Sequence, residues 1–69
     1  MKRIDTSGLS CPEPVIMTKK AVKGLDGGIE VVVDNVASRE NVTRFLEATG
    51  FTVERIEEGK GWLLKASRS

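Results

Sequence analysis

The chain has no histidine and a single cysteine, and these two shortages exclude several common kinds of protein chemistry. One cysteine cannot form a disulfide within the chain, and without histidine there is no Cys/His cluster for a structural zinc ion. A cysteine protease or acyltransferase needs a base, usually histidine, and a dithiol redox centre needs a second cysteine. We therefore expect no metal and no cofactor, and a free thiol in a reducing, cytoplasmic compartment.

The sequence also lacks an excess of charge of either sign and a long apolar run. Lys plus Arg is 11 and Asp plus Glu is 10, so the net charge is +1 at pH 7. A dedicated nucleic-acid binder usually carries a clear basic excess, and aromatic side chains, on which unpaired bases stack, make up only 4% of the chain. No stretch approaches the roughly 20 apolar residues of a membrane span, and no secretory signal is recognisable. We expect neither nucleic acid nor a membrane as a partner.

With 69 residues, the chain is interpreted as one small domain that covers residues 1–69. A domain of this size buries only about 60% of its unfolded surface, so its stability margin is thin. Because disulfides and zinc are excluded, stability must come from well-patterned helices and strands, with weak homo-oligomerisation as a further source.

Apolar periodicity predicts the element order β-α-β-α-β-β. The clearest strand is Ile29–Val33, a run of β-branched residues bounded by turn residues. Each predicted helix is apolar on one side only, which favours an α+β two-layer sandwich with both helices on one face of a mixed four-stranded sheet. The far face would be open to a partner. The predicted strands cover residues 3–6, 29–33, 51–57 and 62–66, and the predicted helices residues 12–24 and 38–50.

Finer predictions concern the two helices. Ser38 is the predicted N-cap of the second helix, and Glu40 and Arg44 are a predicted i,i+4 ion pair. The predicted buried stripe of the first helix consists of Met17, Ala21, Val22 and Leu25. The predicted apolar face of the second consists of Val42, Phe45, Leu46 and Thr49.

The only cysteine and the only two prolines fall within four residues, Cys11-Pro12-Glu13-Pro14. Proline is tolerated in the first turn of a helix, so this motif predicts a helix start with Cys11 at or just before the N-cap. The helix dipole favours the thiolate there. The two prolines lack N–H donors, however, and the Glu13 carboxylate opposes ionisation. We therefore expect an accessible thiol with modest activation.

A lone thiol of this kind has two interpretations. It can attack a disulfide or persulfide sulfur and hold what it receives, because that chemistry needs a thiolate and access but no internal base. Alternatively, it is a small buried apolar residue, as lone cysteines in small domains often are. The residues alone leave both interpretations open.

Three lysines and two aromatic residues also have two interpretations each. Lys19, Lys20 and Lys23 form either a docking face for an acidic patch on a partner or an ordinary solvated helix face. Phe51 and Trp62 either pack in or beside the sheet or lie on its open face as contact residues.

The segment Asp5-Thr6-Ser7-Gly8-Leu9-Ser10-Cys11-Pro12-Glu13-Pro14 resembles the signature of the TusA/SirA/YedF family of sulfur-carrier proteins. That family has a Cys-Pro-x-Pro motif at the start of its first helix, usually preceded by Asp and by Gly-Leu. The length and element order also fit, so the resemblance covers essentially the whole chain. The features that resemble the YedF-type branch are Val33-Asp34-Asn35, Glu40-Asn41-Val42, Arg44-Phe45 and Gly50.

The resemblance implies that Cys11 accepts sulfane sulfur as a persulfide and passes it to an acceptor protein. The pathway would be tRNA thiolation, cofactor synthesis, or sulfur or selenium metabolism, and the donor would be of the cysteine desulfurase or rhodanese type. The alternative is a regulatory or protein/RNA-binding module in which Cys11 is only structural. The resemblance leaves open whether the chain is a stand-alone carrier or a domain of a longer protein.

The same resemblance assigns supporting roles to the neighbours of Cys11. Pro12 and Pro14 would shape the helix start, and Glu13 would lie beside the sulfur. Ser10 departs from the arginine of some relatives, which removes a positive charge near the thiol. The remaining supporting residues of the motif are Asp5, Gly8 and Leu9.

Overall fold

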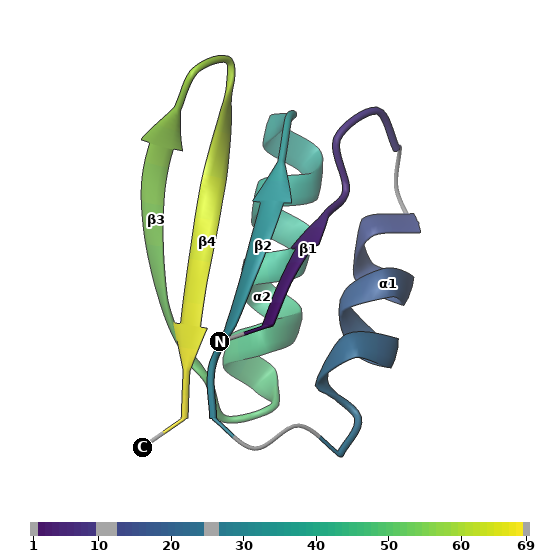
Figure 1. The fold of residues 1–69 in the computed structure, drawn as a ribbon, viewed down its shortest axis with the longest axis vertical. Helices are drawn as coiled ribbons and strands as arrows, with labels where there is room; N and C mark the ends of the chain where they lie inside the picture. The colour runs from purple at the N-terminus through teal and green to yellow at the C-terminus, as the bar shows by residue number, and fades with distance from the viewer. Residues whose placement is uncertain (1, 10–12, 25–26, 69) are drawn as a thin grey trace.

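The computed structural model describes residues 2–9, 13–24 and 27–68 of the chain. In these residues the order of elements is β-α-β-α-β-β, as the sequence predicts (Figure 1). No helix among them is long and apolar enough to span a membrane. The elements are β1 (Lys2–Asp5), α1 (Glu13–Val22), β2 (Ile29–Val33), α2 (Val36–Ala48), β3 (Thr52–Glu58) and β4 (Gly61–Ser67).

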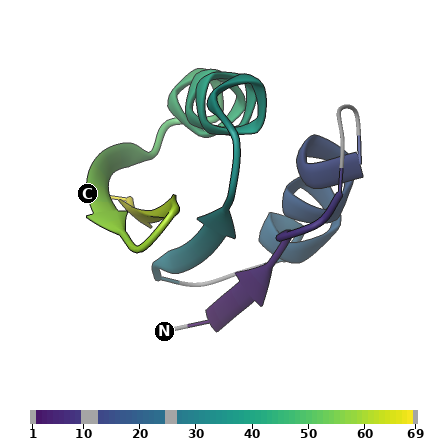
Figure 2. The same cartoon turned by 90° about the horizontal axis from the view of Figure 1, so that it is seen from above.

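The four strands form one mixed sheet in the order β1-β2-β4-β3. β1 and β2 are parallel and are joined through α1, whereas β4 runs antiparallel to both of its neighbours, β2 and β3. Both helices cover the same face of the sheet, and the other face carries no helix (Figure 2). The predicted α+β two-layer sandwich is therefore confirmed.

The core lies between the sheet and the helices. Along β2, Ile29, Val31 and Val33 are fully buried, while the alternate residues Glu30 and Val32 are half-buried on the opposite face. This alternation is the period-2 pattern of a strand with one covered face. The other buried apolar residues of the core cluster are Ala21, Val42, Leu46, Phe51, Leu64 and Ala66.

The buried side of α1 differs from the predicted stripe. The fully buried positions are Pro14 and Thr18, followed by Ala21, whereas Met17 is only half-buried. Thr18 tolerates burial because its hydroxyl donates a hydrogen bond of 2.8 Å to the carbonyl of Pro14, which satisfies the polar group. The prediction for Leu25 falls outside the described residues, as does the prediction that the helix begins at Pro12.

Three predictions for α2 are wrong. Thr49, which was predicted on the apolar face of this helix, is its exposed C-cap. Its N-cap is Asn35 and not Ser38, since the Asn35 side chain accepts a 2.8 Å hydrogen bond from the backbone N–H of Ser38. Ser38 is instead buried in the first turn. Glu40 pairs at 2.9 Å with Arg55 of β3 and not with Arg44, because a neighbouring strand offers a cation in better reach than the helix itself.

Phe51 and Trp62, the two aromatic residues with open interpretations, pack on the covered side of the sheet. Phe51 is buried in the core, and Trp62, which is partly buried, packs against the core. The guanidinium of Arg39 lies 4.7 Å from the centre of the Trp62 ring, and that of Arg68 lies 4.5 Å from the Phe51 ring. Neither aromatic residue is therefore a contact residue of the open face.

Candidate functional site

The loop between β1 and α1 begins at a firmly anchored residue. Thr6 is fully buried, and both its backbone N–H and its hydroxyl donate to the carbonyl of Val32, at 2.9 and 2.6 Å. The Leu9 N–H donates to the Thr6 carbonyl at 3.1 Å, which closes a turn. Within that turn Gly8 has a φ of 82°, a conformation that glycine adopts without steric cost.

Two carboxylates hold the backbone of this turn. Asp5 accepts a hydrogen bond of 2.8 Å from the Ser7 N–H, and Asp34, just after β2, accepts one of 2.7 Å from the Gly8 N–H. The other oxygen of Asp34 accepts a hydrogen bond of 3.0 Å from the Asn35 side chain. Asp5, Gly8 and Leu9 thus lie in or beside one turn. Asp34 also holds this turn, a role that was not predicted when Asp34 was noted as a feature that resembles the YedF-type branch.

Hydrogen bonding keeps Asp5 ionised. The Ser7 hydroxyl and backbone N–H, helped by the Arg3 charge, hold the pKa of the Asp5 carboxyl below its ordinary value of 3.8. A lowered pKa means that this carboxylate stabilises the fold at pH values above 3.8. Its contribution is lost only as the pH falls through the lowered pKa, so the turn keeps its anchor over the physiological range.

The first turn of α1 presents one exposed acid and one buried ring. Glu13 is exposed and Pro14 is fully buried in the core. Ser10, Cys11 and Pro12 lie outside the described residues. The residues on either side of them are fixed, Leu9 by the turn and Glu13 by the helix. The motif therefore joins an anchored turn to the positive end of a helix dipole.

The three lysines predicted as a docking face are all exposed. Lys20 also borders a shallow groove of about 280 Å³ between β1 and α1, with Lys2 on the other side. Apolar side chains line this groove between the two cations. They belong to Ile4, Met17 and Ala21.

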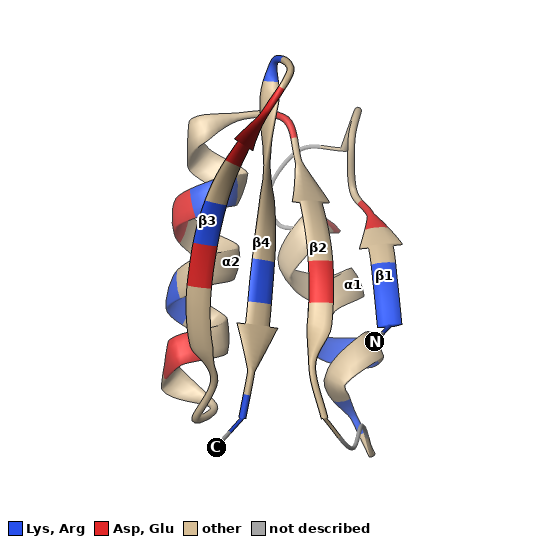
Figure 3. Ribbon diagram, turned by 60° about the vertical axis from the view of Figure 1, so that its left-hand side comes forward, with Lys and Arg blue, Asp and Glu red and all other residues tan. Residues whose placement is uncertain are grey.

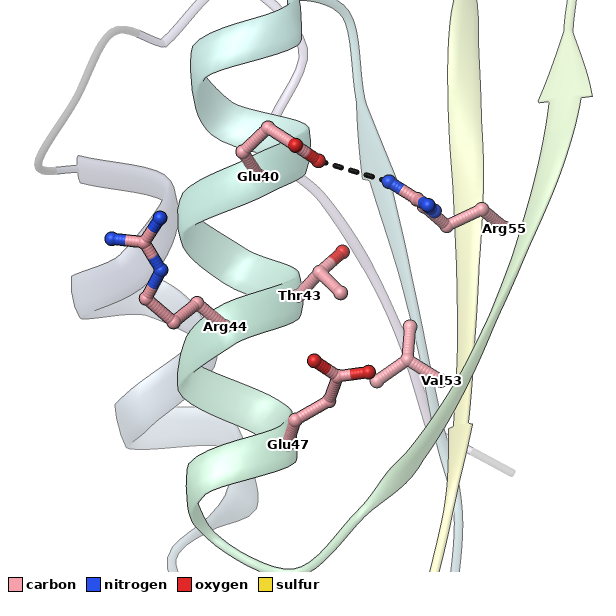
Figure 4. A pocket seen from close by; sticks show the side chains of 6 residues that line it. All are labelled: Glu40, Thr43, Arg44, Glu47, Val53 and Arg55. Atoms are coloured by element: carbon pink, nitrogen blue, oxygen red, sulfur yellow. Dashed lines mark hydrogen bonds and ion pairs between the residues drawn. The ribbon is translucent and has the colours of Figure 1, made fainter.

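A second groove lies between α2 and β3, on the side of α2 away from α1 (Figure 4). It has a volume of about 290 Å³, and the ion pair of Glu40 with Arg55 bridges it. Its lining offers carboxylates, guanidinium groups and one hydroxyl, but no thiol or amine nucleophile. Across residues 2–9, 13–24 and 27–68, no group of three His, Cys, Asp or Glu side chains gathers to hold a metal. The lining residues are Glu40, Thr43, Arg44, Glu47, Val53 and Arg55.

The loop anchors make a testable prediction. Replacing Asp34 by alanine removes the acceptor of the Gly8 N–H, so we expect hydrogen exchange of the Gly8 amide to accelerate about tenfold, since a hydrogen bond to a charged group contributes roughly 1.5 kcal/mol. Amide exchange measured by NMR checks this. Asp5→Ala is the matched control, because it should accelerate exchange at Ser7 and leave Gly8 protected. Equal effects of both variants at both amides would contradict separate anchoring.

Comparison with known proteins assigns a family to the chain, and the match spans both the fold and the cysteine motif. The architecture is that of a small two-layer α+β domain with a cysteine motif between its first strand and first helix. The family model described as sulfurtransferase TusA matches residues 2–65, and the chain belongs to this family.

Individual relatives agree with the family match. A protein of Methanocaldococcus jannaschii with a provisional sulfur-carrier name is 47% identical over 60 residues, which cover 84% of this chain and 80% of the relative. The sulfur carrier protein TusA of Pseudomonas putida is 30% identical over 63 residues, which cover 88% of this chain and 79% of the relative. The crystal structure of a SirA-like protein from Desulfitobacterium hafniense superposes with a TM-score of 0.84 at 37% identity. The superposition covers 97% of this chain and 95% of that protein. Assignment to the YedF-type branch stays a prediction.

Proposed function

We propose that the protein is a sulfur carrier that accepts sulfane sulfur as a persulfide on Cys11 and relays it to an acceptor protein. The observation that carries this proposal is the family match over residues 2–65, which includes the only cysteine of the chain. Relatives named as sulfur carriers support it. The pathway would be tRNA thiolation, cofactor synthesis, or sulfur or selenium metabolism.

The transfer requires a thiolate and access to it. The Cys11 thiolate attacks the terminal sulfur of the donor's persulfide, a new S–S bond forms, and the donor's S–S bond breaks. The bonding electron pair leaves with the donor's own sulfur as a thiolate, so the exchange has no net oxidation. The second transfer repeats the step with the acceptor thiolate as the nucleophile and Cys11 as the leaving group.

The anchored loop fits this role. Thr6 and Asp34 tie residues 6–8 to β2 and its following turn, and Pro14 is packed in the core. A carrier thiol between such anchors would meet two different partners in a reproducible position, with less ordering entropy lost at each encounter. The exposed Glu13 opposes the helix dipole, which keeps the thiol a moderate leaving group as well as a nucleophile.

The donor would be of the cysteine desulfurase or rhodanese type, and Lys19, Lys20 and Lys23 would contact an acidic patch on it. Reversing one charge tests this. Lys20→Glu should slow loading by a cysteine desulfurase supplied with L-cysteine about tenfold, because rim charges act mainly on the association rate. Loading by inorganic polysulfide should be unchanged. Lys60→Glu, in the β3–β4 turn, is the control; an equal loss there would contradict specific docking.

The proposal itself is tested by intact-mass spectrometry of the protein after incubation with a cysteine desulfurase and L-cysteine. The expected product is heavier by one sulfur atom per chain, and a thiol reductant should remove that mass. Absence of any mass increase with a desulfurase, a rhodanese and inorganic polysulfide would overturn the proposal.

A further inference from the structure

The uncovered face of the sheet carries a row of charges whose signs alternate across all four strands. The strand register places Arg3 of β1 beside Glu30 of β2, Glu30 beside Lys65 of β4, and Lys65 beside Glu54 of β3. Figure 3 shows this order as blue, red, blue and red across the sheet. The flanking residues on β2 and β4, such as Val31 and Leu64, are fully buried on the helix side. The row therefore faces away from the core.

We propose that this face binds a second copy of the same chain, with a two-fold axis parallel to the strands between β2 and β4. Such an axis reverses the order of the strands while keeping the row aligned with itself. Arg3 then faces Glu54 of the other copy, and Glu30 faces its Lys65. A row that reads plus, minus, plus, minus is complementary to its own reversal, and a two-fold interface requires this self-complementarity.

A neighbouring row on the same face supplies apolar contact. The register aligns Val32 of β2 with Leu63 of β4 and Leu63 with Ile56 of β3. Ile56 is 37% exposed and is one of the large hydrophobic side chains that the fold leaves uncovered, whereas Val32 is half-buried and Leu63, at the centre of the row, is 8% exposed. Under the same axis Val32 packs on Leu63 of the other copy at the centre. Asp5, at the end of this row, falls opposite Ile56 at the solvent-exposed rim.

The other in-plane two-fold axis fits less well. An axis perpendicular to the strands lays each strand over its own copy, so that like charges meet if the charged row is centred. If the charged row instead meets the apolar row, Glu30, Lys65 and Glu54 each lie on an apolar side chain, which is unfavourable for buried charges. The order of charges thus selects the strand-parallel axis.

The size of the face and one existing ion pair set the strength of the dimer. Four short strands offer less than the roughly 800 Å² per partner of a standard interface, so the association is weak. Arg3 also makes an ion pair of 3.6 Å with Glu58 on the far edge strand. Both side chains are more than half exposed, so opening or sharing this pair costs little.

Sedimentation equilibrium of the whole chain tests the proposal. We expect a reversible monomer–dimer equilibrium with a dissociation constant below about 1 mM, a value at the weak end of protein association. Raising the salt from about 50 mM to 500 mM should weaken it severalfold, because surface charges are screened. A chain that stays monomeric at about 1 mM in low salt would overturn the proposal.

Charge variants separate contacts between copies from contacts within the sheet. Lys65→Glu should raise the dimer dissociation constant at least tenfold, whereas Lys60→Glu, off this face, should not. The double variant E30K/K65E places like charges side by side within one sheet, but every pair between copies stays attractive. It should therefore recover dimerisation while losing some thermal stability as a monomer. A double variant that dimerises no better than Lys65→Glu would contradict the proposed interface.

Discussion

Replacing Cys11 by serine is expected to abolish sulfur uptake completely while leaving the fold intact. The chain has no other thiol, and a serine hydroxyl has neither the nucleophilicity nor the capacity to form an S–S bond. Intact-mass spectrometry after incubation with a cysteine desulfurase and L-cysteine should show no added sulfur. The result separates a carrier from a regulatory or binding module, because only the carrier requires this atom.

The control for this variant is its stability. If Cys11 serves chemistry, Cys11→Ser should change the free energy of unfolding by no more than about 0.5 kcal/mol, as exposed substitutions do. If the thiol is a buried core residue, serine should destabilise the fold by about 1–3 kcal/mol, and the wild-type thiol should resist alkylation in the folded state. Retained sulfur uptake by Cys11→Ser, or a large loss of stability, would contradict the carrier role.

The largest stability effect is expected at the centre of the sheet. Leu64 is fully buried on β4, beside Val31 of β2, and belongs to the core cluster. Leu64→Ala removes this side chain and leaves a cavity under the helices, at a cost of about 2–5 kcal/mol. Small domains have total stabilities of about 5 kcal/mol or slightly more, so the variant should be largely unfolded in mild urea.

Urea titration followed by circular dichroism measures this effect. The midpoint should fall sharply for Leu64→Ala, and the control Ser67→Ala, on an exposed position of the same strand, should shift by no more than about 0.5 kcal/mol. A loss below about 1 kcal/mol for Leu64→Ala would show that the site collapses around the missing atoms, contrary to a tightly packed core.

Elements with a strong local signal were predictable from the sequence. The strand Ile29–Val33 has the predicted bounds, because a β-branched run between turn residues carries its own signal. The N-cap of α2 was missed because Asn35 and Ser38 are both good capping residues. The choice depends on which side chain reaches a free N–H, and the Asn35 side chain reaches Ser38.

Contacts between distant segments were not predictable in the same way. The bond from Gly8 to Asp34 joins residues 26 positions apart, and Glu40 takes its partner from β3. Gly61 lies between the predicted strands 51–57 and 62–66, yet it belongs to β4, and a side chain there would collide with the backbone carbonyl of Val33. Each of these contacts depends on which strands are neighbours in the sheet. Local patterns in a single sequence do not reveal the order of the strands. Hydrophobic periodicity likewise predicts Met17 as core, because it cannot register that the Thr18 hydroxyl is satisfied by its own helix.

The central claim is that Cys11 carries a transferable sulfur, and cyanolysis tests it most directly. The protein is incubated with a cysteine desulfurase and L-cysteine, separated from both, and treated with cyanide, which takes the outer sulfur of a persulfide and releases thiocyanate. We predict about one thiocyanate per chain, return of the protein to its unloaded mass, and none from Cys11→Ser. Equal thiocyanate from the wild type and Cys11→Ser, or none from either, would contradict the account.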